Sequence, residues 1–248
     1  IAVPQEAFGP RAGNPMDLQP GDRLTLRDAL YSTLLGSDNV SALTVASFVG
    51  RDLVSRRGGG APIAAFVAEM NNLARSLRMS KTHFTAPHGL DAGNSVSTSC
   101  ALDMALLGVY SMQNPAFCYI VSQASRRIEV QSQTKGRTMY DISNNNKLMS
   151  ASGVDGIKAG TSRAAGSCLL LSVTRNAISR RSPQTGTEVI YPQRMIIAVL
   201  GSANRYSLAR EMMNTGWRVW ENWQASGMDM KDPKEFVQLP MKSASQRR

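Results

Sequence analysis

The chain has 248 residues, of which 42% are hydrophobic, enough for a packed core, and this composition excludes an intrinsically disordered chain. No run approaches the roughly 18 apolar residues of a membrane-spanning helix, which predicts that the chain has no such helix. The 28 Lys and Arg against 18 Asp and Glu give a net charge of +10. The charges are scattered singly, which favours a solvated face, although a basic surface can also attract an acidic wall polymer or an anionic membrane surface. No zinc-finger spacing or ribonucleoprotein motif is present, so no nucleic-acid partner is predicted.

The sequence contains no cluster of residues that is typical of a metal site. Cys100, Cys118 and Cys168 are widely spaced and form no CxxC pair, and the chain has only two histidines. We therefore predict no metal and no cofactor, and we interpret each cysteine as a small buried apolar residue.

Three helices are predicted in the first third of the chain. Residues 1–22 are rich in Pro and Gly and are typical of loops. Helical spacing of apolar residues then predicts helices over 25–35, 40–54 and 63–77. Gly36 ends the first of these helices, so the residues that follow it lie in a tight connection.

The rest of the chain mixes helices with strands. The patterns predict a helix over 101–112, strands over 127–131, 153–160, 167–174 and 195–200, and an amphipathic helix over 207–223. The strands 167–174 and 195–200 are predicted to form an antiparallel pair joined by a polar loop with Pro183 and Gly186. This order indicates an α+β fold in which helices cover an antiparallel sheet. We expect one domain over 1–227 and a polar tail over 228–248.

Several motifs occur in a characteristic order. Ser37-Asp38-Asn39 and Lys158-Ala159-Gly160 are similar to two of the three signatures of penicillin-recognising serine enzymes. Between them lie Thr82-His83-Phe84 and Pro87-His88-Gly89-Leu90-Asp91. This ordered set resembles the low-molecular-mass D-alanyl-D-alanine carboxypeptidases, which are penicillin-binding proteins, and the resemblance covers roughly residues 16–224. It implies a β-lactamase/penicillin-binding-protein-like fold.

The resemblance assigns catalytic roles to three residues. Ser37 would relay a proton to the leaving amine, and Asn39 would donate its amide N–H to a substrate carbonyl. Lys158 would supply positive potential near the substrate's terminal carboxylate. Read without the family, Ser37 and Asn39 can equally cap the second helix, and Lys158 can be a surface lysine.

Three further residues are implied to bind substrate. Gly160 would let a peptide lie against the strand, and the backbone N–H of Thr161 would form half of the oxyanion hole. Arg205 falls near the family's carboxylate-binding arginine, but the spacing differs, so a surface arginine is the alternative. His83 and His88 are interpreted as members of a structural loop.

The sequence departs from the family at two places. Ala159 occupies the position where the family has a threonine that helps to hold the terminal carboxylate. The nucleophile motif, Ser-x-x-Lys, occurs only at Ser132–Lys135. We reject Ser132 as the nucleophile because it follows the Ser-Asp-Asn triplet in a polar, strand-like stretch. We expect the true motif in a segment that would precede Ile1, and we expect this chain alone to be inactive.

The resemblance implies a serine-type carboxypeptidase. Such an enzyme trims peptidoglycan stem peptides that end in D-Ala-D-Ala through an acyl-enzyme, acts outside the cytoplasm and is inhibited by β-lactams. The alternative is a degenerate, non-catalytic homologue that binds wall peptide or a partner. A β-lactamase is disfavoured because no Glu-x-x-Leu-Asn string lies between the two triplets.

Overall fold

The computed structural model describes residues 1–9, 13–90, 96–181 and 186–227. Its elements are, in chain order, η1 (Gln5–Ala7), β1 (Arg23–Leu24), α1 (Leu26–Tyr31), η2 (Ser32–Gly36), α2 (Asn39–Arg57), α3 (Pro62–Ser76), α4 (Ala101–Ser111), α5 (Pro115–Val121), β2 (Ser125–Ser132), β3 (Gly136–Ser143), β4 (Val154–Ser162), β5 (Gly166–Arg181), β6 (Glu188–Val199) and α6 (Arg205–Ala225). The strands form two antiparallel sheets, in the orders β1-β2-β3 and β4-β5-β6. The prediction of helices combined with antiparallel strands is confirmed.

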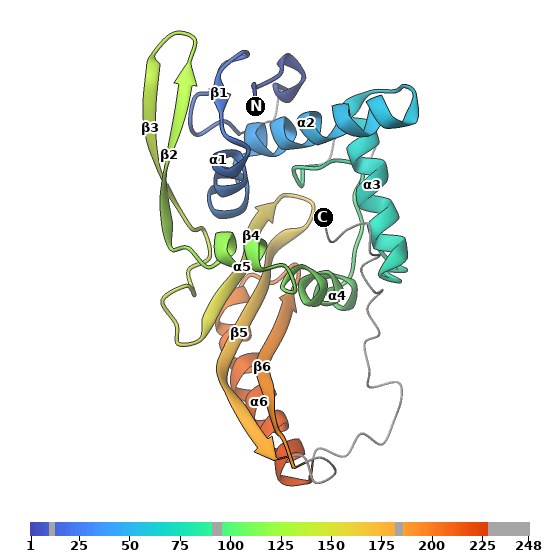
Figure 1. Ribbon diagram of the computed structural model, residues 1–248, viewed down its shortest axis with the longest axis vertical. Coiled ribbons are helices and arrows are strands. Elements are labelled where there is room, and N and C mark those ends of the chain that lie inside the picture. The colour runs from blue at the N-terminus through green and yellow to red at the C-terminus, as the bar shows by residue number, and fades with distance from the viewer. Residues whose placement is uncertain (10–12, 91–95, 182–185, 228–248) are drawn as a thin grey trace.

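The first sheet and the early helices form one end of the molecule (Figure 1). Their shared core contains the fully buried Leu18, Tyr31, Leu35 and Val130. Helices α2 and α3 approach closely at Gly50, which has no side chain. A Cβ atom added there would lie only 2.0 Å from the carbonyl oxygen of Pro62. Helix α2, which begins within the Ser-Asp-Asn triplet, is therefore packed both against this core and against α3.

The second sheet lies between helices (Figure 1), with α6 against one face and α4 and α5 against the other. Side chains that alternate along β5 fill both interfaces: Leu169 and Leu171 pack in the core that includes Trp217 of α6, whereas Leu170 packs with Val121 of α5. The continuous apolar run in β5 is thus explained by burial on both faces of the sheet.

The predicted elements differ from the structure in two ways. Helix α5 and strands β1 and β3 were not predicted: α5 is short, and β3 alternates between partly and largely exposed residues, so its apolar pattern is weak. The loop predicted between the last two strands is wrong over most of its length, because β5 continues to Arg181 and β6 begins at Glu188. Polar residues there hide the strand pattern. Pro183 and the predicted tail lie outside the described residues.

Candidate active site

The Ser-Asp-Asn triplet lies in a sharp turn between two helical segments. Ser37 adopts a left-handed backbone conformation (φ 62°), and its N–H donates to the carbonyl of Ser32 and so ends η2. Asp38 is the N-cap of α2, because its Oδ1 accepts a hydrogen bond of 2.5 Å from the N–H of Ser41. The capping interpretation therefore applies to Asp38, while Ser37 is exposed and Asn39 half-buried.

This turn is fixed from a distant part of the chain. The N–H of Asn145 donates to the carbonyl of Leu35 (3.0 Å), and its Nδ2 donates to the carbonyl of Gly36 (2.8 Å). The carbonyl of Asn145 accepts a hydrogen bond of 3.1 Å from the hydroxyl of Tyr206 on α6. Residues more than a hundred positions apart thus set the distance between the triplet and the second sheet.

Strand β4 forms the opposite wall. It pairs with β5 on one edge, and its other edge has no strand partner in the described part of the chain. Lys158 lies in this strand and donates from Nζ to the carbonyl of Ala159 (2.5 Å). Burial of Lys158, together with the positive charge of Arg205, lowers the pKa of its ammonium group to about 8. At pH 7 the group is still mainly protonated, and no carboxylate of the described residues contributes to its pKa.

Arg205, the first residue of α6, reaches over β4. Its Nη1 donates to the carbonyl of Gly160 (2.6 Å), to Oγ1 of Thr161 (2.8 Å) and to the carbonyl of Cys168 (3.3 Å). Its guanidinium also lies 4.8 Å from the ring centre of Tyr206. Arg205 is therefore hydrogen-bonded to the strand that contains Lys158, although its spacing in the sequence differs from that of the family.

These residues enclose one cavity of about 440 Å³. Five of the sequence-predicted site residues line it: Ser37, Asn39, Lys158, Gly160 and Thr161. The sixth, Arg205, does not line it but is hydrogen-bonded to Gly160 and Thr161. Cys168, Met104 and Leu170 contribute apolar surface to the same cavity. Within the described residues no group of three or more His, Cys, Asp or Glu side chains is placed to hold a metal ion.

The two departures from the family occupy different places. Ala159 is 3% exposed and packs in the core on the α6 face of the sheet, so most of its side chain is turned into the protein. Ser132 ends β2, far along the chain from the cavity lining, and its Oγ accepts from the N–H groups of Thr134 and Lys135. Lys135 forms a 2.7 Å ion pair with Asp17. Neither Ser132 nor Lys135 lines the cavity.

The two histidines of the predicted structural loop lie in different surroundings. His88 is one of the residues that line the cavity, whereas His83 is exposed and pairs through its backbone with Thr98. Burial lowers the pKa of the His88 imidazole, which makes the neutral form prevail at pH 7. The hydrogen-bonding surroundings of Asn39 favour the amide orientation in which its nitrogen donates to the carbonyl of His88 (3.2 Å) and its oxygen accepts from the N–H of Gly13 (3.2 Å). The hydrogen bond between Asn39 and His88 could not be predicted from any motif or spacing in the sequence.

Five buried side-chain polar atoms have no hydrogen-bond partner among the described residues: Tyr31 Oη, Thr33 Oγ1, Asp38 Oδ2, His88 Nδ1 and Gln224 Nε2. Asp38 belongs to the triplet, and His88 lines the cavity. Burial also raises the pKa of the Asp38 carboxyl. Unpartnered buried polar atoms are uncommon in folded proteins and are typical of functional sites.

Known proteins resemble both this sequence and this fold. The family model described as D-alanyl-D-alanine carboxypeptidase matches residues 4–182. The D-alanyl-D-alanine carboxypeptidase DacC of Escherichia coli is 27% identical over 216 residues, which are 85% of this chain and 45% of that protein. The D-alanyl-D-alanine carboxypeptidase of Streptomyces sp. strain K15 is 30% identical over 157 residues, 62% of this chain and 52% of that one. The chain spans about half the length of these curated relatives.

Solved structures agree with the sequence match. The crystal structure of the Streptomyces K15 DD-transpeptidase superposes with a TM-score of 0.66 at 26% identity, covering 83% of this chain and 72% of that one. An evolved putative penicillin-binding protein homologue from Mycobacterium tuberculosis gives a TM-score of 0.60 at 25% identity, covering 81% and 64%. These matches confirm the predicted penicillin-binding-protein-like fold. Because the family model matches well over half of its residues, the chain belongs to the D-alanyl-D-alanine carboxypeptidase family.

Proposed function

We propose that this chain forms the substrate-binding walls of a serine-type D-Ala-D-Ala carboxypeptidase that trims peptidoglycan stem peptides outside the cytoplasm. One observation carries the proposal: a largely buried lysine, Lys158, lines the same cavity as Ser37 and Asn39, beside an edge of β4 that no strand of the described residues pairs with. Cations enclosed in a cavity that exposes a strand edge suit an extended peptide with a terminal carboxylate. β-Lactams, which mimic this peptide end in the family, are proposed inhibitors.

The site residues fit the chemistry of acyl transfer. A peptide added along β4 meets no side chain at Gly160, where even a Cβ atom would have open space around it. Its terminal carboxylate would bind near Lys158 and the Arg205–Thr161 pair, which are both hydrogen-bond donors. A serine oxygen attacks the carbonyl between the two D-alanines, the N–H of Thr161 stabilises the oxyanion, and Ser37 passes a proton to the departing amine. Water then hydrolyses the acyl-enzyme.

The serine and lysine of the nucleophile motif are proposed to come from outside these 248 residues. Within them the only Ser-x-x-Lys is Ser132–Lys135, whose lysine is paired with Asp17 away from the cavity. The unpartnered atoms of Thr33 and Asp38 support this proposal, because they offer hydrogen bonds to a further polar group beside the triplet.

A non-catalytic homologue is the second candidate. The sequence feature that favours it is Ala159, which stands where the family has a threonine. Such a protein would bind wall peptides in the same cavity and release them unchanged.

Peptide binding tests the walls of the cavity. The 248-residue chain is titrated with diacetyl-L-Lys-D-Ala-D-Ala and, as a control, with the L-Ala-L-Ala diastereomer, and binding is followed by nuclear magnetic resonance (NMR) spectroscopy. We expect the D,D peptide to perturb Lys158 and Asn39 and the L,L peptide to bind more weakly. Equal affinity for both peptides, or no binding, would contradict the proposal.

Acylation by a fluorescent penicillin separates the two candidates. We expect no covalent labelling of this chain alone, and labelling of a longer gene product in which a Ser-x-x-Lys helix is present. Labelling of this chain at Ser132 would show that our assignment of the nucleophile is wrong. Binding without labelling by the longer product would establish the non-catalytic homologue.

A further inference from the structure

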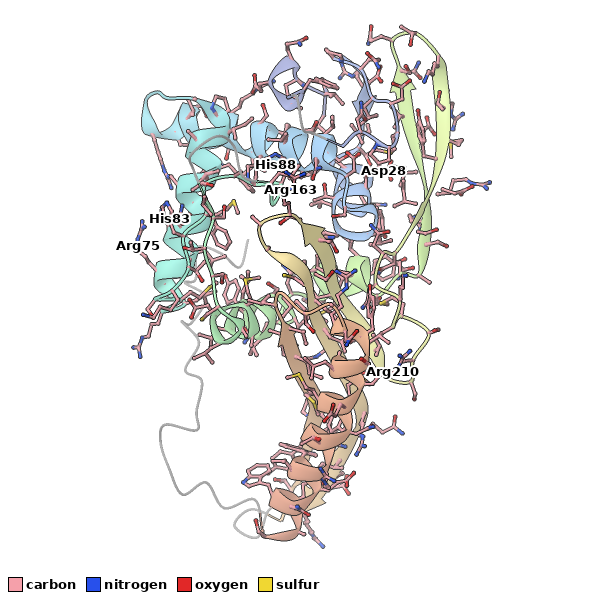
Figure 2. All side chains as sticks on the ribbon, turned by 180° about the vertical axis from the view of Figure 1, so that it is seen from behind. Asp28, Arg75, His83, His88, Arg163 and Arg210 are labelled. Carbon is pink, nitrogen blue, oxygen red and sulfur yellow. The ribbon has the colours of Figure 1, made fainter. Side chains whose placement is uncertain are left out.

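We infer that His88 is a substrate-binding residue whose Nε2–H donates a hydrogen bond to the edge of the bound peptide that faces away from β4. This inference deepens the proposed function and rests on it. His88 lines the same cavity as Lys158 and Gly160, but it comes from the loop that follows α3 rather than from β4. Figure 2 shows His88 between α2 and the β4–β5 hairpin, whereas His83 lies beside α3.

An extended peptide needs partners on two edges. Its backbone N–H and C=O groups point alternately to both sides, so pairing with β4 satisfies only one side. Groups left unpaired inside a cavity reduce affinity. Away from β4, the cavity is lined by the polar residues Ser37, Asn39 and His88. Among these three, His88 has a ring nitrogen, Nδ1, that is buried and has no hydrogen-bond partner in the described part of the chain.

Hydrogen bonds hold the backbone of the loop that carries His88. Asn71 on α3 anchors the loop, because its Oδ1 accepts from the N–H of Phe84 and its Nδ2 donates to the carbonyl of the same residue, both at 2.8 Å. The N–H of Thr85 donates to Oγ of Ser97 (3.1 Å). The carbonyl of His88 itself accepts from the Asn39 amide. A preorganised donor loses little freedom on binding, which makes its hydrogen bond more effective.

The free nitrogen of the imidazole can be assigned. Nδ1 is enclosed by protein and has no hydrogen-bond partner among the described residues. A buried N–H without an acceptor is costly, so the proton of the neutral ring is assigned to Nε2. The half-exposed ring then presents Nε2–H to the cavity, where a peptide carbonyl can accept it.

Two substitutions separate the hydrogen bond from the shape of the loop. His88→Leu removes the donor, and His88→Gln places an amide near the position of Nε2; both keep the backbone carbonyl that binds Asn39. We expect His88→Leu to weaken binding of diacetyl-L-Lys-D-Ala-D-Ala about 5- to 10-fold and His88→Gln to change it less than twofold. The matched control is His83→Leu in the same loop, which we expect to leave the affinity unchanged.

A measurement on the unmodified chain covers the case in which His88→Leu fails to fold. The protein has only two histidines, so its imidazole NMR signals can be assigned with His83→Gln alone. On titration with the D,D peptide we expect the His88 signals to shift and the His83 signals to stay in place.

The outcomes are distinguishable. If the wild-type chain binds the D,D peptide but its His88 signals do not move, or a folded His88→Leu variant binds as tightly as wild type, the role of His88 is wrong and the proposed function survives. If the wild-type chain binds no D,D peptide, both the proposed function and this inference are wrong.

Discussion

The hairpin β2–β3 and the edge strand β4 each present a lysine that sequence motifs single out, yet the two lysines have opposite surroundings. Lys135 is exposed, and its hydrogen bond and ion pair with Asp17 raise its pKa. Lys158 is buried without a carboxylate partner in the described part of the chain, and its pKa falls to about 8. The Ser-x-x-Lys string at Lys135 matches a catalytic pattern letter for letter, but only Lys158 lies in a cavity.

The surroundings of a lysine, rather than the motif in which it stands, therefore decide whether it can bind an anion. A buried cation retains its attraction for an anion because water does not screen it, whereas an exposed ion pair contributes little. The structure also allows each lysine to serve as a control for the other.

The largest expected effect is on peptide binding. Lys158→Met should weaken the affinity for diacetyl-L-Lys-D-Ala-D-Ala about 100-fold, because a charge-assisted hydrogen bond to the terminal carboxylate is lost. Lys135→Met should leave the affinity unchanged. Isothermal titration calorimetry measures the peptide affinity of both variants. An equal loss of affinity in the two would show that Lys158 has no special role in peptide binding.

The same Lys158→Met variant should stabilise the fold. The pKa of Lys158 is lower in the folded protein, about 8, than its ordinary value of 10.5, so the fold prefers the neutral amine and the charged form destabilises it. The penalty is complete below pH 8 and disappears as the pH rises towards 10.5. We expect roughly 2 kcal/mol of added stability at pH 7, measured by urea unfolding at pH 7 and pH 10. A gain that does not shrink at the higher pH would mean that burial of the charge is not its cause.

Arg205 should affect both binding and the charge of Lys158. Arg205→Gln removes the guanidinium that donates hydrogen bonds to Gly160 and Thr161. It also removes a positive charge that lowers the pKa of Lys158. We expect about tenfold weaker peptide binding and a higher pKa of Lys158, followed by NMR titration of its side chain. The control is Arg210→Gln on the same helix. A Lys158 pKa that stays at about 8 would exclude electrostatic coupling between the two residues.

The smallest effect concerns the departure at Ala159. Because this side chain is almost fully buried on the α6 face, Ala159→Thr should add atoms to a packed core and lower stability by about 1 kcal/mol, without tighter peptide binding. Thermal unfolding and the peptide titration test the two parts. Tighter binding would show that a hydroxyl at this position does reach the cavity.

Much of the fold could be predicted from local patterns. The helices that became α2, α3, α4 and α6 were predicted within a few residues of their ends, since apolar spacing and caps act over one or two turns. Strand β3 and the outer halves of β5 and β6 were missed, because their stability comes from pairing with strands rather than from their own apolar content. None of the helices in the described residues is long and apolar enough to cross a membrane.

The family and the candidates Ser37, Asn39, Lys158, Gly160 and Thr161 could be predicted from the amino-acid sequence, because several motifs in a fixed order are specific to a family wherever the chain places them in space. Only the tertiary structure decided that Arg205 contacts β4, that Ala159 lies mostly in the core, and that His88 rather than His83 lines the cavity. The physical reason is that burial, charge coupling and unsatisfied hydrogen bonds depend on which distant segments meet. In this chain those segments are the Ser37 turn, the His88 loop, β4 and the start of α6.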